Sequence, residues 1–285
     1  MYLIVGATGN LGGAITHMAL AQGKPVRILA RLSSNYQPLA AAGAQVMLGD
    51  LKERASLDPA CQGADVVITT ANSAQRGGAD NPQTVDLEGN RNLIDAAKAA
   101  GVKQFIFVSV AGADPNSPIP FVAAKGKTEA YLQASGVPYT ILSPNAFMEF
   151  WIGVYIGLPA RQGRPVTLVG EGRRRHSFIS AADVATFTLA AIAHPRAINQ
   201  RLILGGPEPL SFRDAVAAYE RVLGKHIIVQ SINPGVPVPG VPEAVWGLAA
   251  GFDTFDSPMD MTETARTFGV KLTSLEEFVR QSVLA

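Results

Sequence analysis

The chain has 285 residues, of which 47% are hydrophobic and 16% charged, so a disordered protein is excluded and a domain with an appendage is expected. A net charge of +1 excludes a general basic field for nucleic acid or an anionic membrane, and a single cysteine, Cys61, excludes an internal disulfide and a thiolate metal cage. We therefore expect a cytoplasmic monomer or homodimer that acts on a small molecule, with no nucleic acid, membrane or metal among its partners.

Short apolar runs alternate with helical patterns over residues 1–143. The predicted strands are YLIVG from Tyr2, PVRILA from Pro25, AQVMLG from Ala44, DVVITT from Asp65, QFIFVS from Gln104 and PYTILS from Pro138. Strands that are apolar throughout are typical of a parallel sheet with both faces covered by helices. The sequence therefore predicts a doubly wound α/β fold.

The pattern loosens after residue 145. Predicted elements are strands at PVTLVG and RLILGG, a helix capped near Ser180, a helix over 212–224, a strand at HIIVQSI, a proline-rich connection over 233–242 and two terminal helices. We assign residues 1–150 and about 176–205 to the main domain. Residues from about 151–175 and 206–285 are assigned to a smaller C-terminal α/β lobe.

The stretch VGATGNLGG joins the first strand to the first helix and carries Gly6, Gly9 and Gly12 in the spacing GxxGxxG. Glycines in this context permit a tight turn and let backbone N–H groups approach a pyrophosphate at the helix N-terminus. The residues expected to hold a dinucleotide here also include Thr8, Asn10 and Leu11. The alternative is a purely structural turn.

Arg31 follows the second strand, with Ser33 and Ser34 close behind it. A free ribose 2′-hydroxyl is usually held by an acid at this place, whereas a 2′-phosphate calls for a cation with fork geometry. The sequence therefore favours NADPH over NADH, although NADH stays possible, because an arginine can also stack on adenine or remain solvated.

The third and fourth strands end in further candidates for the adenosine side of the cofactor. Asp50 and Leu51 follow the third strand, and Asp50 is placed to accept a hydrogen bond from the adenine amino group. Thr70 and Ala71 follow the fourth strand and are expected to line the same side through their backbone.

Several segments together resemble one family. VGATGNLGG, LGDL, VDLEGNRNLIDAAKAAGVKQFIFVS, YTILSPNAFME and HSFISAADVA are similar, in order, to the NmrA-like group of atypical short-chain dehydrogenases/reductases. That group includes isoflavone-reductase-like enzymes, quinone and dye reductases, and non-catalytic redox-sensing regulators. The resemblance implies a Rossmann domain that binds NAD(P)H, with the C-terminal lobe binding the substrate.

The resemblance also implies a catalytic position for Lys125, which matches the lysine of the family's tyrosine–lysine pair. Phe121 then stands in the tyrosine's place, and a phenyl ring can neither donate nor accept a proton. Lys125 is expected either to bind the nicotinamide ribose or, if desolvated, to act as an acid or base; a solvated surface lysine is the alternative. Ser109, after the fifth strand, is expected to polarise a substrate oxygen or only to end the strand.

The loop SPNAFMEF follows the sixth strand, and the resemblance places Pro144, Asn145 and Phe147 against the nicotinamide. The apolar residues that follow, including Trp151 and Tyr155, either cover a substrate pocket or form ordinary core. His176, at the end of a basic run, is expected at the surface, and a role in proton transfer is the alternative.

We therefore expect an NAD(P)H-dependent reductase that transfers hydride to a small quinone-like or aromatic acceptor without the usual tyrosine. Such acceptors need no strong protein acid, so the protein has mainly to orient the nicotinamide. One alternative is an NAD(P)-sensing regulator with no turnover. Another is an assembly factor that has retained the fold.

Overall fold

A computed structural model describes residues 1–74, 76–241 and 245–284. The chain forms two compact units, the first made of Met1–Pro144 with Val184–Ile203 and the second of Asn145–Asp183 with Leu204–Ala285. The end of the predicted proline-rich connection, Pro242, lies outside the described residues.

Seven strands form the central sheet, in the order β3-β2-β1-β4-β5-β6-β8. They are β1 Tyr2–Val5, β2 Val26–Ala30, β3 Gln45–Leu48, β4 Val66–Thr69, β5 Gln104–Val108, β6 Tyr139–Pro144 and β8 Gln200–Leu204. Every pairing from β3 to β6 is parallel, which confirms the predicted doubly wound α/β fold. Every residue of β4 and β5 is buried, as continuous apolar runs require, whereas the edge strand β3 is partly exposed.

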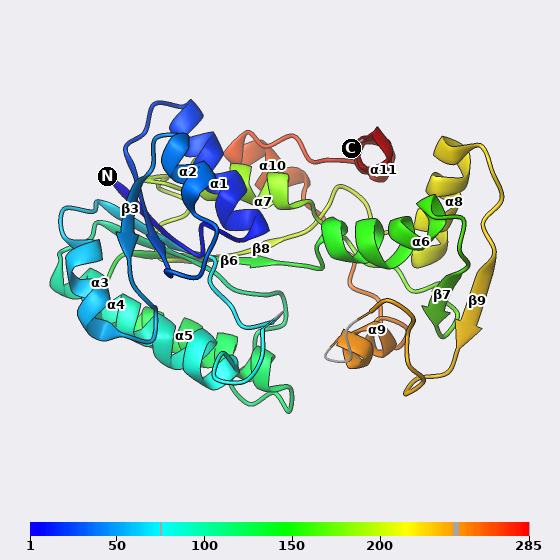
Figure 1. The fold of residues 1–285 in the computed structure, drawn as a ribbon, viewed down its shortest axis with the longest axis horizontal. Coiled ribbons are helices and arrows are strands. Elements are labelled where there is room, and N and C mark those ends of the chain that lie inside the picture. Colours follow the sequence, from blue (N-terminus) through cyan, green and yellow to red (C-terminus); the bar gives the residue numbers. More distant parts are fainter. Residues whose placement is uncertain (75, 242–244, 285) are drawn as a thin grey trace. The chain divides into compact units, whose positions relative to one another are not determined.

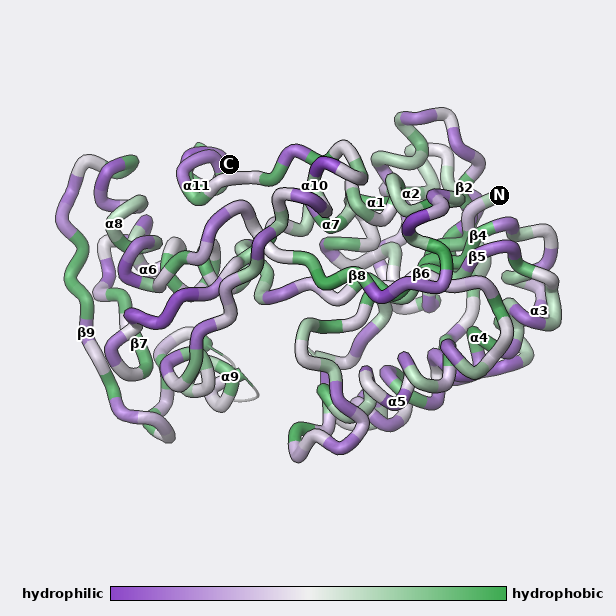
Figure 2. Tube along the Cα trace, turned by 180° about the vertical axis from the view of Figure 1, so that it is seen from behind, coloured by the Kyte–Doolittle hydropathy of each residue, from purple (hydrophilic) through white to green (hydrophobic). Residues whose placement is uncertain are grey.

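Helices cover both faces of this sheet (Figure 1). One face carries α3 Arg54–Cys61, α4 Asn90–Ala99 and α5 Pro120–Ala134, and the other carries α1 Asn10–Ala21, α2 Gln37–Ala41 and α7 Ala181–Ala190. A π-helical segment, η1 Pro82–Gly89, leads into α4. Figure 2 shows hydrophobic colours along β4 and β5, while α4 and α5 alternate between hydrophilic and hydrophobic. The buried face of α4 is mainly apolar, whereas that of α5 also includes Lys125 and Glu129.

The order of the strands reverses at β1. The chain first moves outward from β1 to β2 and β3, and then crosses to β4 on the other side of β1. In open α/β sheets the carboxyl ends of the strands on either side of such a reversal leave a crevice in which ligands bind. The residues that follow β1, β2, β3 and β4 are therefore the first place to look for a site.

The second unit has its own small sheet and its own core. Its elements are η2 Glu149–Gly157, α6 Leu158–Arg161, β7 Val166–Val169, α8 Phe212–Leu223, β9 Val229–Ile232, α9 Trp246–Gly251, α10 Thr262–Phe268 and α11 Leu275–Leu284. β7 and β9 pair in parallel. Within the described residues, no helix combines the length and the apolar character needed to cross a bilayer.

The segment 176–183 belongs to this second unit, whereas the sequence analysis had placed it with the main domain. The reason is a set of hydrogen bonds: Ser177 N donates to Ser257 O at 3.1 Å, and Met259 N donates to Ser177 Oγ at 2.9 Å. The chain returns to the first unit only from Val184 onward. The predicted cap of α7 is confirmed, since Ser180 Oγ accepts from Asp183 N at 3.0 Å.

Candidate functional site

The loop between β1 and α1 is packed so tightly that its first and third glycines admit no side chain. Gly6 has a φ of +86°, and a Cβ there would lie 2.7 Å from Thr70 Oγ1 and 2.8 Å from Ala71 N. A Cβ on Gly12 would overlap the carbonyl oxygen of Gly6. The spacing seen in the sequence therefore has a steric cause: the loop, the start of α1 and the end of β4 share one narrow space.

The N-terminus of α1 presents backbone donors at this loop. The helix begins at Asn10 after Gly9, no side chain caps it, and no acidic residue lies in its first turn. The first N–H groups of a helix have no partner within the helix, and they carry the positive end of its dipole. Thr8, Gly9 and Asn10 are exposed beside them. An anionic group such as a pyrophosphate fits this end of the helix.

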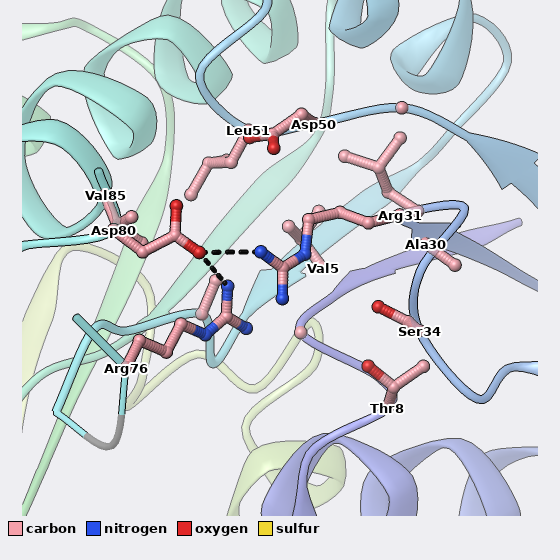
Figure 3. Close-up of a pocket in the computed structure, with 14 residues that line it drawn as sticks. Val5, Thr8, Ala30, Arg31, Ser34, Asp50, Leu51, Arg76, Asp80 and Val85 are labelled. Atoms are coloured by element: carbon pink, nitrogen blue, oxygen red, sulfur yellow. Dashed lines mark hydrogen bonds and ion pairs between the residues drawn. The ribbon is translucent and has the colours of Figure 1, made fainter. Parts of the chain in front are cut away.

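A hollow that is open to solvent lies where the first four strands end. It is lined by Val5, Gly6, Thr8, Leu29, Ala30, Arg31, Ser34, Gly49, Asp50, Leu51, Ala71, Arg76, Asp80 and Val85. Figure 3 shows Arg31 and Arg76 pointing at Asp80, with Ser34 and Thr8 on one side and Asp50 and Leu51 on the other. The hollow therefore lies at the strand ends where the sheet order reverses.

Three cations pair with Asp80, one of the carboxylates that line this hollow. Asp80 Oδ2 lies 2.6 Å from Arg31 Nη1 and 3.3 Å from Arg76 Nη1, and its Oδ1 lies 2.6 Å from Lys52 Nζ. These hydrogen bonds, that of Lys52 first, lower the pKa of Asp80 from 3.8 to about 2. Lys52 Nζ also lies 3.9 Å from Asp50 Oδ2, and the bond to Asp80 raises the pKa of Lys52.

The structure brings most of the predicted adenosine-side residues to this hollow. Arg31, Asp50, Leu51 and Ala71 line it directly. Thr70 is tied to the loop, because its Oγ1 donates to Gly6 O at 3.3 Å. Leu11 and Gly12 lie in the first turn of α1.

Ser33 is exposed and does not line the hollow, whereas Ser34 does.

Sequence reasoning missed Arg76 and Asp80. They lie in the segment RGGAD, which resembles no binding motif, and Asp80 is 49 residues from Arg31 along the chain. Asp80 directly precedes the capping box in which Asn81 and Thr84 start η1, so a helix-start pattern was the one available signal. That pattern predicts the start of a helix, and it does not predict the contact between Asp80 and Arg31, which follows β2.

Lys125 is buried, not solvated. Its side chain is 3% exposed, and its Nζ forms an ion pair with Asp86 Oδ1 at 3.3 Å. Its Nζ also donates to Val108 O at 3.3 Å and lies 4.9 Å from the centre of the Phe107 ring and 5.5 Å from that of Phe121. Burial lowers the pKa of Lys125, while Asp86 opposes that shift.

Ser109 is also held by neighbours. Its hydroxyl donates to Glu129 Oε1, and Glu129 Oε2 accepts from Arg201 Nε at 2.8 Å. Arg201 Nη2 donates in turn to Val110 O at 3.3 Å. The hydroxyl hydrogen of Ser109 is therefore already committed within the unit, and its remaining lone pairs can only accept.

The loop after β6 is held by hydrogen bonds and a backbone bridge, whereas the aromatic residues that follow it lie in a hydrophobic core. Asn145 Nδ2 donates to Ser257 Oγ at 3.2 Å, and Phe147 bridges Ile179. Trp151 and Tyr155 are buried in the core of the second unit, and Tyr155 Oη accepts from Val169 N at 3.1 Å. Of the two interpretations of these aromatic residues, ordinary core is the one that the structure bears out.

The expectation that His176 is at the surface was wrong. The residue is 1% exposed, and its Nδ1 lies 2.8 Å from Ser257 Oγ and its Nε2 2.9 Å from Phe252 O. A carbonyl can only accept, so Nε2 carries the hydrogen and Nδ1 accepts from the serine hydroxyl. Burial lowers the pKa of His176 and favours this neutral ring. The described residues contain no cluster of three or more His, Cys, Asp or Glu able to hold a metal ion.

The comparisons with known proteins place the chain in a family. The model of the NmrA-like family matches residues 2–279, and the chain belongs to that family. A photosystem II assembly factor of Cyanophora paradoxa is 34% identical over 230 residues, which cover 81% of this chain and 71% of that protein. An NAD(P)H azoreductase of Xenophilus azovorans is 30% identical over 227 residues, 80% of this chain and 75% of that protein.

A solved structure agrees over nearly the whole chain. It is an NADPH-dependent quinone oxidoreductase from Escherichia coli in complex with NADPH. The match has a TM-score of 0.81 at 25% sequence identity and covers 99% of both chains. The Rossmann-like arrangement predicted from the sequence is thus shared with a protein that holds NADPH.

Proposed function

We propose that this protein is an NAD(P)H-dependent reductase that transfers hydride to a small quinone-like or aromatic acceptor. The observation that carries the proposal is the hollow at the ends of the first four strands. It combines a loop too tight for side chains, an uncapped helix N-terminus and a group of cations. Relatives named as azoreductase and quinone oxidoreductase support the same activity.

The residues present fit a nicotinamide dinucleotide. The absence of a side chain at Gly6 and Gly12 lets the loop pack against the end of β4, and the free N–H groups at the start of α1 can donate to a pyrophosphate. Asp50 lines the hollow and can accept from an adenine amino group, and Arg31 can bind a 2′-phosphate. This arrangement favours NADPH, because the cations of the hollow outnumber its acids.

The cofactor supplies the hydride, and the protein has to orient the acceptor and exclude competing reactions. Pro144, Asn145 and Phe147 are our proposed contacts of the nicotinamide, on the grounds of the family resemblance. A quinone, an azo group or a cationic dye takes up hydride without a strong acid from the protein. Phe121 in place of a tyrosine is compatible with such acceptors and not with an ordinary alcohol or ketone.

Lys125 and Ser109 are our candidates for the residues at the nicotinamide end, since both lie where β5 ends. We propose that they hold the shape of the site and that the proton for the reduced acceptor comes from water. The Lys125 ammonium is paired with Asp86 in a buried space, and the Ser109 hydroxyl already donates to Glu129. Neither group can give up a proton without leaving a buried charge unpaired.

A second function is a cofactor-binding protein with no turnover, either a redox sensor or an assembly factor. The identity to a photosystem II assembly factor favours it, as does the phenyl ring at Phe121. Such a protein would keep the hollow intact and still discriminate between reduced and oxidised cofactor.

The test is NADPH oxidation with a panel of quinones, azo dyes and triphenylmethane dyes, each run against a blank without acceptor. The reductase proposal predicts acceptor-dependent oxidation with at least one class. If no acceptor is reduced, but calorimetry shows that NADPH and NADP⁺ bind with different affinities, the function is sensing. If neither form binds, both proposals fail, and a factor that has kept only the fold remains.

A further inference from the structure

Three cations surround the carboxylate of Asp80. Arg31, Lys52 and Arg76 all place a nitrogen within 2.6 to 3.3 Å of its two oxygens. The three cations come from separate parts of the chain, after β2, after β3 and before η1. Their side chains are 31% to 35% exposed, whereas that of Asp80 is 14% exposed. The carboxylate therefore lies inside a ring of cations that can still be reached from solvent.

The charges of this cluster do not balance. Three cations meet the single charge of Asp80, and Asp50, 3.9 Å from Lys52, supplies one more negative charge on one side. A net positive charge remains beside the hollow. A phosphate monoester, with a charge approaching two and three acceptor oxygens, matches three converging cations better than one carboxylate does.

The backbone on either side of Asp80 is held by hydrogen bonds that do not involve its carboxylate. Asn81 and Thr84 form a reciprocal capping box that starts η1, and Asp80 N donates to Gly77 O at 3.2 Å. Among the hydrogen bonds that the structure describes, the Asp80 carboxylate receives bonds from Arg31, Lys52 and Arg76 alone. Its side chain is therefore free to rotate away if the three cations acquire another anion.

We propose that Asp80 is an internal substitute for the 2′-phosphate of NADPH, which occupies the phosphate subsite in the free protein and is displaced when the phosphate binds. This inference rests on the proposed function, because it assumes that the hollow receives the adenosine end of the cofactor. Asp80 then keeps the three cations preorganised and lowers the affinity for 2′-phosphorylated ligands. It has no corresponding effect on ligands that lack the phosphate.

The experiment compares the full-length protein with Asp80→Asn by calorimetric titration with adenosine 2′,5′-bisphosphate and adenosine 5′-monophosphate. Asparagine keeps the shape of the side chain and removes the charge that competes with the phosphate. We expect the bisphosphate to bind about tenfold more tightly to the variant, equivalent to about 1.4 kcal/mol. The monophosphate should bind the two proteins within about twofold.

Two further variants of Asp80 and one control variant test whether the charge of Asp80 causes the effect. Asp80→Glu keeps the charge and should keep the weak bisphosphate binding, and Asp80→Ser replaces the asparagine variant if that one does not fold. Asp65→Asn is the matched control, since Asp65 also has a pKa lowered to about 2 by ion pairs but lies at the opposite end of β4. It should leave both titrations unchanged.

The titrations distinguish failure of the inference about Asp80 from failure of the proposed function. Unchanged or weaker bisphosphate binding in Asp80→Asn overturns the inference, because Asp80 would then only position the cations. Weaker monophosphate binding also overturns it, because Asp80 would then accept from the ribose hydroxyl as an acid that selects NADH does. If neither ligand binds the unmodified protein or the variant, NADPH and NADH replace them in the same titrations, and absence of binding by both cofactors means that the proposed function itself fails. If the bisphosphate binds the unmodified protein but binds Asp80→Asn no more tightly, the inference about Asp80 fails and the proposed function stands.

Discussion

Two ionic clusters of the first unit use the same chemistry in opposite ways. In the hollow, Arg31, Lys52 and Arg76 surround Asp80, and each cation stays about one third exposed. Between α5 and η1, Lys125 pairs with Asp86 one to one, with side chains 3% and 0% exposed. The first cluster has surplus positive charge and access to solvent, and the second has neither.

The first cluster is the candidate binding site, and the second is expected to support the fold beside it. An exposed cluster with excess cations can exchange its internal anion for a ligand at little desolvation cost, because the cations remain hydrated when free. A dry pair cannot, since removing either partner leaves an uncompensated buried charge. We therefore expect changes in the buried pair to alter folding, and changes in the hollow to alter nucleotide binding.

The largest effect is expected from the buried pair. Asp86→Ala should lower the free energy of unfolding by about 3 to 5 kcal/mol, because it leaves the Lys125 ammonium buried without its counter-charge. It also removes the acceptor of Ser73 N and Ser73 Oγ. Denaturant unfolding measures the loss. The double variant Lys125→Met with Asp86→Ala should be more stable than Asp86→Ala alone. A loss of unfolding free energy below about 1 kcal/mol in Asp86→Ala would show that the pair is not buried as described.

A smaller effect, on binding alone, is expected in the hollow. Arg31→Ala should weaken NADPH binding by about 1.5 to 3 kcal/mol, the range for a hydrogen bond to a charged group, and change NADH binding little. Calorimetry with both cofactors measures it. Arg54→Ala is the control, because Arg54 pairs with Asp58 on the surface of α3. Equal losses for NADPH and NADH would remove Arg31 from the phosphate subsite.

Two glycine-to-alanine substitutions at the start of α1, Gly12→Ala and Gly13→Ala, form a matched pair. Gly12→Ala should cost about 1 to 3 kcal/mol of stability, because its Cβ overlaps Gly6 O, and it should weaken both cofactors alike. A Cβ on Gly13 would lie 3.4 Å from Ala7 O, which is an ordinary contact. Gly13→Ala should therefore change neither the stability nor the binding of either cofactor. Thermal unfolding and cofactor titration measure the two effects. Normal cofactor binding by Gly12→Ala would place the pyrophosphate elsewhere.

The smallest effect is a dependence on pH. The pKa of Asp80 is lowered to about 2, so its ion pairs stabilise the folded state above about pH 4, and this contribution is lost as the pH falls toward 2. The contribution should be below about 1 kcal/mol, since its partners are partly exposed. Asp80→Asn should lack this part of the acid-induced loss. Identical stability profiles of the two proteins between pH 4 and 2 would show that the ion pairs contribute nothing.

The sheet and the glycine loop were predictable because their signals are local. A buried parallel strand must be apolar at every position, and a phosphate-binding turn needs its glycines within a few residues. Arg31 and Asp50 were predictable for the same reason, since each follows a recognisable strand end.

The partners of these residues were not predictable. Asp80 and Lys52 are 28 residues apart, and Asp86 pairs with Lys125 across two elements, so no spacing along the chain brings either pair together. His176 follows three arginines, which indicates a surface, yet its ring is turned into the second unit by Ser257 and Phe252. The aromatic residues after Asn145 could not be assigned because a core and a pocket require the same apolar stripe.

The most direct test of the central claim is a calorimetric comparison of NADPH and NADH on the unmodified protein. The account holds that surplus cations at the ends of β2 and β3 receive the 2′-phosphate, so it predicts that NADPH binds at least about tenfold more tightly than NADH. Tighter binding of NADH, or no heat with either cofactor, would contradict it.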